Sequence, residues 1–118
     1  MTTGRYLARC NNCGPAAFPD SASVYEIDAS SPSIIWNVEK VGNQIAFVAD
    51  SGKYLARCNN CWNKSTYPDA VFVQATSSKD QLALWKPIYI GYGKWVFRGN
   101  NGKYLTRCQS CVNEGSYP

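Results

Sequence analysis

The 118-residue sequence contains no histidine. Catalytic sites and metal sites that depend on imidazole are therefore excluded. The aspartates are isolated in turn-forming stretches, and none has a second carboxylate at a spacing typical of acid/base catalysis. The sequence also has no Gly-rich loop of the kind that holds phosphate. We expect a protein without enzymatic activity, cofactor or bound metal.

Long hydrophobic runs are missing too. No apolar run reaches the roughly 20 residues that a membrane-spanning helix needs, and the three residues before the first motif leave no room for a signal peptide. The 12 basic and 8 acidic residues give a net charge of +4 and form no run of one sign. Such a mildly basic surface is not typical of nucleic-acid binding. We therefore expect no membrane span and no nucleic-acid partner.

No window carries apolar residues at helical spacing. Apolar residues instead form short β-branched or aromatic runs between stretches rich in Gly, Asn, Ser, Asp and Pro. The strands expected on this basis include residues 24–27, 34–38, 45–48, 54–58, 71–74, 83–87 and 95–98. Pro87 has no backbone N–H, so its strand is expected to be an edge strand or to be bulged there. The sequence predicts one all-β domain over residues 1–118.

A motif of ten residues occurs three times. Its copies begin at Gly4, Gly52 and Gly102, and each continues with a basic residue, Tyr, Leu, a small residue, Arg and Cys-x-x-Cys. A second landmark recurs with nearly the same period, since Trp36 and Trp85 are 49 residues apart. The sequence therefore predicts two full repeats, 4–51 and 52–101, and a partial third repeat, 102–118.

Alternation along the motif strand places Leu55 on the opposite face from its neighbours Tyr54 and Ala56. We expect Leu55 to face the core, with Leu7 and Leu105 equivalent to it. Gly52 follows two turn-forming residues, which predicts a tight turn with positive φ before the strand.

Gly-x-Tyr-Leu at the start of a strand, with a Trp strand about 30 residues later, resembles the β-trefoil repeat of fascin-like and lectin-like domains. The resemblance implies a β-trefoil-like barrel of about nine or ten short strands, built from two and a third repeats of about 49 residues. A closed trefoil takes three repeats, so the partial third repeat leaves sheet edges to be covered. A smaller barrel, a homodimer or further sequence would each cover them.

All six cysteines lie in the three motifs as Cys-x-x-Cys pairs: Cys10 and Cys13, Cys58 and Cys61, Cys108 and Cys111. Successive pairs are separated by 45 and 47 residues, counted from the second cysteine of one pair to the first of the next, which is longer than zinc ribbons use. A thioredoxin-like redox pair opens a helix, and none is expected here. The favoured interpretation is a disulfide within each pair, while pairing between repeats stays open. If the cysteines form disulfides, the protein is expected to be secreted or extracellular. If they are reduced thiols, it is expected to be cytoplasmic.

The loops after the cysteine pairs present repeated polar and aromatic side chains. Amides donate and accept hydrogen bonds, as hydroxyl-rich ligands require, and aromatic rings offer flat apolar surfaces. The predicted ligand-binding residues are Arg57, Asn59, Asn60, Trp62, Tyr67 and Asp69 in the second loop, and Arg9, Asn11, Asn12 and Asp20 in the first. An alternative is that the asparagines shape the turns and that the arginine stems pack along the sheet.

These observations predict a non-enzymatic binding module. Its most concrete form is a small disulfide-stapled, lectin-like protein with a glycan as its partner. The resemblance also implies an alternative, a fascin-like protein that binds actin with its cysteines reduced. A protein-binding or defence role is the third possibility.

Overall fold

The computed structural model describes residues 6–10, 13, 21–26, 28, 30–59, 61 and 69–106, and for residues 23–26 and 69 it describes the backbone alone. Its eight strands in these ranges are β1 (Tyr6–Cys10), β2 (Ser21–Glu26), β3 (Asn37–Val41), β4 (Gln44–Val48), β5 (Tyr54–Asn59), β6 (Asp69–Ala75), β7 (Lys86–Gly91) and β8 (Lys94–Arg98). Two short 3₁₀ helices, η1 (Pro32–Ile34) and η2 (Gln81–Ala83), separate the hairpins. The expected all-β class is confirmed. Within these ranges, no helix has the length and apolar character needed to cross a bilayer.

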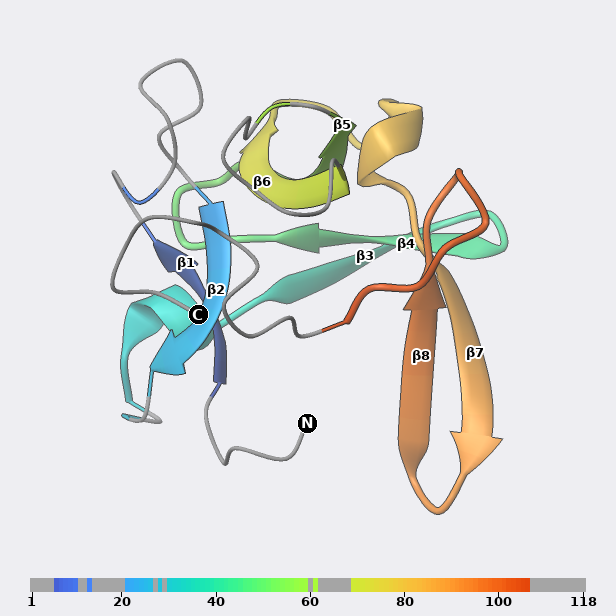
Figure 1. Ribbon diagram of the computed structural model, residues 1–118, viewed down its shortest axis with the longest axis horizontal. Helices are drawn as coiled ribbons and strands as arrows, with labels where there is room; N and C mark the ends of the chain where they lie inside the picture. The colour runs from blue at the N-terminus through green and yellow to red at the C-terminus, as the bar shows by residue number, and fades with distance from the viewer. Residues whose placement is uncertain are drawn as a thin grey trace.

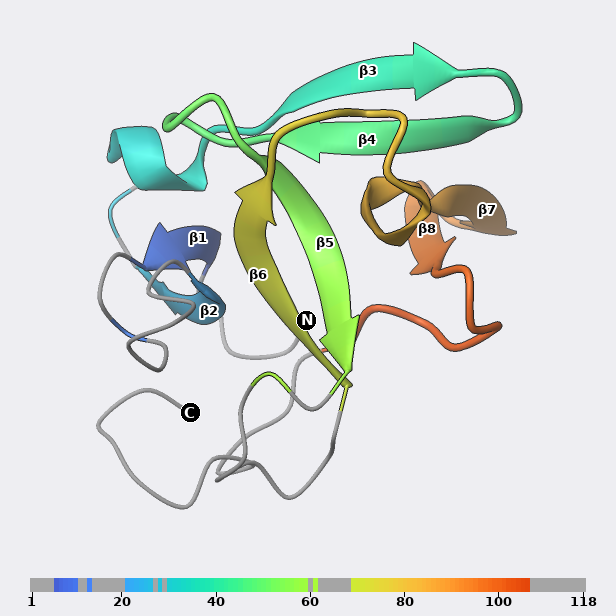
Figure 2. The same cartoon turned by 90° about the horizontal axis from the view of Figure 1, so that it is seen from above.

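Six strands form one antiparallel sheet in the order β1-β2-β6-β5-β4-β3, and β7 pairs with β8 in a separate hairpin (Figure 1). The sheet consists of three hairpins joined by single residue pairs, Ser21 with Phe72 and Val48 with Tyr54. Because so few bonds tie one hairpin to the next, the hairpins turn relative to one another. The sheet consequently curls into a half-barrel, which is clearest from above (Figure 2).

The β1–β2 and β5–β6 hairpins share one irregularity of register. The pairing shifts between Tyr6 and Leu7 in the first hairpin, and between Tyr54 and Leu55 in the second. Beyond the shift, residues pair one to one toward the cysteines. The two hairpins therefore deliver their cysteine pairs from strands of the same shape.

The strands predicted over 34–38 and 83–87 begin too early, because η1 and η2 end at residues 34 and 83 and two residues separate each from the strand that follows. Pro32 favours the helical turn of η1, and Asp80 caps η2 by accepting a hydrogen bond from the Leu82 backbone N–H at 3.0 Å. The strands start later, at residues 37 and 86. In the described part of the chain β7 pairs with β8 alone, so the edge position expected for Pro87 is confirmed.

The core is centred on Leu55, which is fully buried together with Val73 and Trp85. Leu7 and Leu105 pack against the same cluster, so the inward orientation expected for the three motif leucines is confirmed. Further side chains that pack there are Ala22, Trp36, Ile45, Phe47, Val71 and Phe97. The core thus combines residues from both predicted repeats and from the start of the third.

Candidate functional site

Two strands carry a bonded cysteine at or beside their last residue, Cys10 at the end of β1 and Cys58 one residue before the end of β5. Cys10 forms a disulfide with Cys13 after β1, and Cys58 forms one with Cys61 after β5. Both pairs have Cα atoms 5.6 Å apart, within the usual disulfide range. A bridge that closes so short a loop fixes the direction in which the chain leaves the strand. We call these two positions the first corner and the second corner.

Local disulfides are thereby confirmed for two of the three predicted pairs. Cys108 and Cys111 lie outside the described residues.

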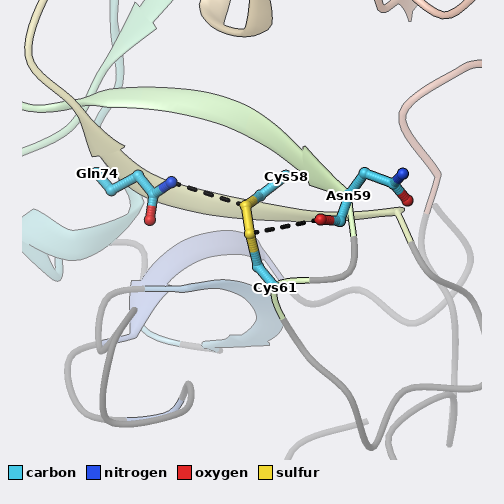
Figure 3. Close-up of a disulfide and its surroundings, with 4 residues drawn as sticks. All are labelled: Cys58, Asn59, Cys61 and Gln74. Carbon is cyan, nitrogen blue, oxygen red and sulfur yellow. Dashed lines mark hydrogen bonds between the residues drawn. A yellow bond between two sulfur atoms is a disulfide. The ribbon is translucent and has the colours of Figure 1, made fainter.

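Gln74 of β6 lies against the disulfide of the second corner (Figure 3). Its Nε2–H group donates a hydrogen bond to Cys58 Sγ over 3.8 Å, and Cys61 Sγ lies 3.8 Å from the backbone carbonyl oxygen of Asn59. The other amide atom, Gln74 Oε1, is buried and has no hydrogen-bond partner among the described groups. Buried polar atoms are usually satisfied, so this oxygen is an exception within the described part of the chain.

The first corner has a similar feature. Ser21 pairs directly with Cys10 across the hairpin and is fully buried. Its hydroxyl oxygen also has no hydrogen-bond partner among the described groups. Each corner therefore contains one buried polar atom beside its disulfide that is left unsatisfied there.

The motif arginines tie each corner strand to a distant turn. Arg9 forms an ion pair with Asp50, with 2.6 Å between Nε and Oδ1, and Arg57 Nε donates to Asn100 Oδ1 at 2.9 Å. The hydrogen bond from Arg9 holds the pKa of Asp50 below its ordinary value of 3.8. Both arginines were predicted to bind ligand. That stays a prediction, and among the described groups their guanidinium groups contact Asp50 and Asn100.

Those turns precede the second and third copies of the motif. In each, the glycine N–H donates to a carbonyl three residues earlier, from Gly52 to Ala49 at 3.0 Å and from Gly102 to Gly99 at 3.1 Å. Gly52 and Gly102 have φ values of 81° and 82°, which confirms the expected positive φ. The arginine contacts thus attach the corners to turns of fixed geometry.

The structure brings three of the predicted ligand-binding residues to the second corner. Asn59 is exposed at the end of β5 and its backbone pairs with that of Asp69, while Arg57 lies two residues earlier on the same strand. Arg9 lies at the first corner. The remaining predicted residues lie outside the described ranges: Asn11, Asn12, Asp20, Asn60, Trp62 and Tyr67.

The end of the β7–β8 hairpin carries an exposed aromatic surface that was not predicted from the sequence. Tyr89 and Trp95 pair across the strands with ring centroids 5.0 Å apart, and each is more than half exposed. Gly91 and Gly93 predicted only a turn there. The signal available in the sequence was the Tyr92 side chain between these glycines, because a bulky aromatic residue is unusual in a tight turn.

Comparison with known proteins adds no name to this geometry. No family model matches the chain, and a search of curated proteins finds no significant match. The evidence for the function of the two corners is therefore the residues that form them.

Proposed function

We propose that this protein is a non-catalytic binding module that recognises glycans through the loops at its two corners. The observation that carries the proposal is the arrangement at the second corner. There the exposed Asn59 lies on one side of the Cys58–Cys61 disulfide and Gln74, with its unsatisfied Oε1, lies on the other (Figure 3). Amide groups donate and accept at once, which suits the hydroxyl groups of sugars.

A disulfide within the loop supports this function by ordering the loop before the ligand arrives. A preorganised loop loses less conformational entropy on binding, so more of the interaction energy contributes to affinity. The arginine contacts with Asp50 and Asn100 act in the same direction, because they hold the strand from which each loop departs.

We also propose that the predicted repeats form a β-trefoil-like arrangement. Two recurring contacts support it: the indole N–H of Trp36 donates to the Leu7 carbonyl oxygen, and that of Trp85 donates to the Leu55 carbonyl oxygen. The shared register shift of the two motif hairpins supports it as well. Completion of the third repeat by a second copy of the chain stays a proposal, and a solution mass twice that of one chain would support it.

The two disulfides are compatible with the oxidising environment of a secreted protein. An intact mass under non-reducing conditions tests this part of the proposal. Loss of six hydrogens relative to the reduced chain is expected. Six free thiols in the natively isolated protein would instead favour the fascin-like alternative.

A glycan array followed by titration calorimetry tests the ligand. We expect binding to at least one glycan, weakened about tenfold by Asn59→Ala, since one lost hydrogen bond of about 1 kcal/mol or slightly more corresponds to that change. Asn43→Ala is the matched control, because Asn43 is an exposed asparagine in the β3–β4 turn. No binding across a broad array, or equal effects of the two substitutions, would contradict the proposal.

A further inference from the structure

The β7–β8 hairpin extends away from the six-stranded sheet as a separate finger (Figure 1). It is attached at its base, where Phe97 packs edge-on against Phe47 with ring centroids 5.0 Å apart. The backbone groups of Trp85, just before β7, also exchange two hydrogen bonds with those of Ile45. The base is therefore fixed by the core, while the far end extends outward.

That far end is apolar and exposed. Tyr89, Ile90 and Trp95 are each more than half exposed, and Tyr92 is 98% exposed. Single exposed apolar residues are ordinary on protein surfaces. Four of them fall within residues 89–95 of one projecting hairpin, and such a concentration of exposed apolar side chains is typical of an interaction surface. We call these four residues the aromatic tip.

The turn of the aromatic tip has an unusual backbone. Tyr92 has a φ of 56°, and its neighbours Gly91 and Gly93 have φ values of 95° and 71°. A bulky residue in the left-handed region is strained, and such strain is found most often at functional positions. The Gly93 N–H donates to the Tyr89 hydroxyl oxygen at 3.0 Å, so the turn is held in this shape.

The β3–β4 hairpin shows that the fold does not need this tip. It also follows a 3₁₀ helix and a tryptophan, yet its turn is Gly42-Asn43 and its strands carry Glu39 and Lys40 where β7 has Ile88 and Tyr89. Its turn has no aromatic residue and no residue other than glycine with positive φ. The aromatic tip is therefore a property of this surface and not a requirement of the hairpin.

The charged residues of the β7–β8 hairpin are all basic. Residues 81–113 contain five of the twelve basic residues and none of the eight acidic residues. Within the hairpin, Lys86 pairs directly with Arg98 across the strands, and Lys94 pairs with Gly91 near the turn. Like charges placed opposite each other repel, so an anionic partner would stabilise this arrangement.

We infer that the aromatic tip inserts into the interfacial region of a bilayer containing anionic lipids. Tyr92 and Ile90 enter the boundary between headgroups and acyl chains, where Tyr and Trp are favoured because each ring has an apolar body and a polar end. Lys94 pairs with Gly91 beside the turn and lies near the headgroups, while Lys86 and Arg98 at the base of the hairpin attract the anionic ones from farther away. This inference is independent of the glycan proposal, because it uses neither corner.

The chemistry of the hairpin favours lipid over a sugar. Residues 86–98 contain no Asn, Gln, Asp or Glu, so no side-chain amide or carboxylate is present to bind sugar hydroxyls. Ile90 at the tip also has no ring to stack on a sugar or a base. A projecting apolar end with Lys94 beside it, on a hairpin whose charged residues are all basic, instead matches a surface with an anionic outer layer and an apolar interior.

Co-sedimentation with lipid vesicles tests the inference. We expect the protein to bind phosphatidylcholine vesicles containing about one third phosphatidylserine, and to be released by high salt, since the attraction of the basic residues is screened. The double variant Ile90→Ser, Tyr92→Ser should weaken binding roughly tenfold or more, because it removes the apolar part of the tip. Lys94→Glu should weaken it by about fivefold or more.

Val38→Ser provides the matched control, because Val38 on β3 is 58% exposed and Ile90 is 57% exposed. It should bind vesicles like the unsubstituted protein. All variants are first checked by circular dichroism, so that a loss of binding is not a loss of folding. No binding of the unsubstituted protein to the anionic vesicles, or equal binding by the tip variant, would overturn the inference.

Two further arms distinguish a bilayer from a soluble polyanion. Bromine-labelled lipids should quench the fluorescence of the bound protein, and Trp95→Phe should remove most of that quenching, since Trp95 is the tryptophan at the tip. Any binding of heparin or single-stranded DNA should not depend on Ile90 and Tyr92. If either polyanion binds with the same dependence on the tip and the vesicles do not, the membrane inference is wrong.

Discussion

Trp85 donates its indole N–H to the backbone carbonyl oxygen of Leu55 over 3.1 Å, and both residues are buried in the same core cluster. Trp36 makes the same bond to Leu7 over 3.0 Å. Both tryptophans follow a 3₁₀ helix, so each bond attaches the next hairpin to the motif strand before it. The two bonds differ in burial, since Trp85 is only 2% exposed and Trp36 is partly exposed.

This difference predicts unequal effects of removing the two bonds. Trp85→Phe leaves the Leu55 carbonyl oxygen buried without its donor and should lower the free energy of unfolding by about 1–3 kcal/mol. Trp36→Phe should cost less, about 0.5–1.5 kcal/mol, because water reaches that position. Equilibrium urea denaturation measures both. Equal losses, or a larger loss for Trp36→Phe, would contradict the assignment of Trp85 to the core.

The Arg9–Asp50 pair predicts a pH dependence of stability. The folded pKa of Asp50 lies below the ordinary 3.8 because Arg9 donates to it, so the unfolded chain binds the proton more tightly. The stabilisation is therefore fully present above pH 3.8 and is lost as the pH falls through the lower, folded pKa. Asp50→Asn should remove this decrease in stability at low pH. At neutral pH it should lower the free energy of unfolding by up to about 1 kcal/mol, since both side chains are partly exposed.

Asn100→Asp is the complementary test. It places a carboxylate where Arg57 now meets an amide, so it should raise the free energy of unfolding by up to about 1 kcal/mol at neutral pH. It should also introduce a new decrease in stability at low pH. Denaturant midpoints measured between neutral pH and about pH 3 give both quantities. The carboxyl group of Asp28, whose pKa is lowered by the hydroxyl and backbone N–H of Ser30, is common to all the variants and cancels in the comparison. An unchanged acid limb in Asn100→Asp would show that the carboxylate does not reach Arg57.

Much of the fold was predictable because local patterns determine it. Strand alternation separated Leu55 from Tyr54 and Ala56, and the expectation that Leu55 faces the core is confirmed, although Ala56 on the other face is buried too. Turn chemistry predicted the positive φ of Gly52. The contact between Arg9 and Asp50 was not predictable, since 41 residues separate them and their approach depends on how the hairpins turn relative to one another. The exposure of Tyr92 was missed for a related reason. A sequence shows which residues are apolar but not which hairpin extends beyond the core.

Gly52 lies in the turn that Arg9 contacts through Asp50, and its backbone conformation predicts the cost of replacing it. Gly52 adopts a φ of 81°, and a Cβ atom added there would meet no atom within 4 Å. The cost of Gly52→Ala should therefore come from backbone strain alone, about 1–2 kcal/mol. Gly52→Asn should cost less, because asparagine tolerates the left-handed region better. Thermal unfolding followed by circular dichroism separates the two, and equal melting temperatures would contradict the strain argument.

The disulfide of the second corner should matter more for the loop than for the fold. Replacing Cys58 and Cys61 together by Ser should lower the free energy of unfolding by roughly 2 kcal/mol or less, because the closed loop is short. Leu55→Ala is the reference, expected to cost about 2–5 kcal/mol through the cavity it leaves in the core. If the corner binds a glycan, the double serine variant should lose affinity while it stays folded at 25 °C. A folded double variant with full affinity would show that the loop reaches its binding shape without the bridge, and a loss of stability as large as that of Leu55→Ala would place the disulfide among the main supports of the fold.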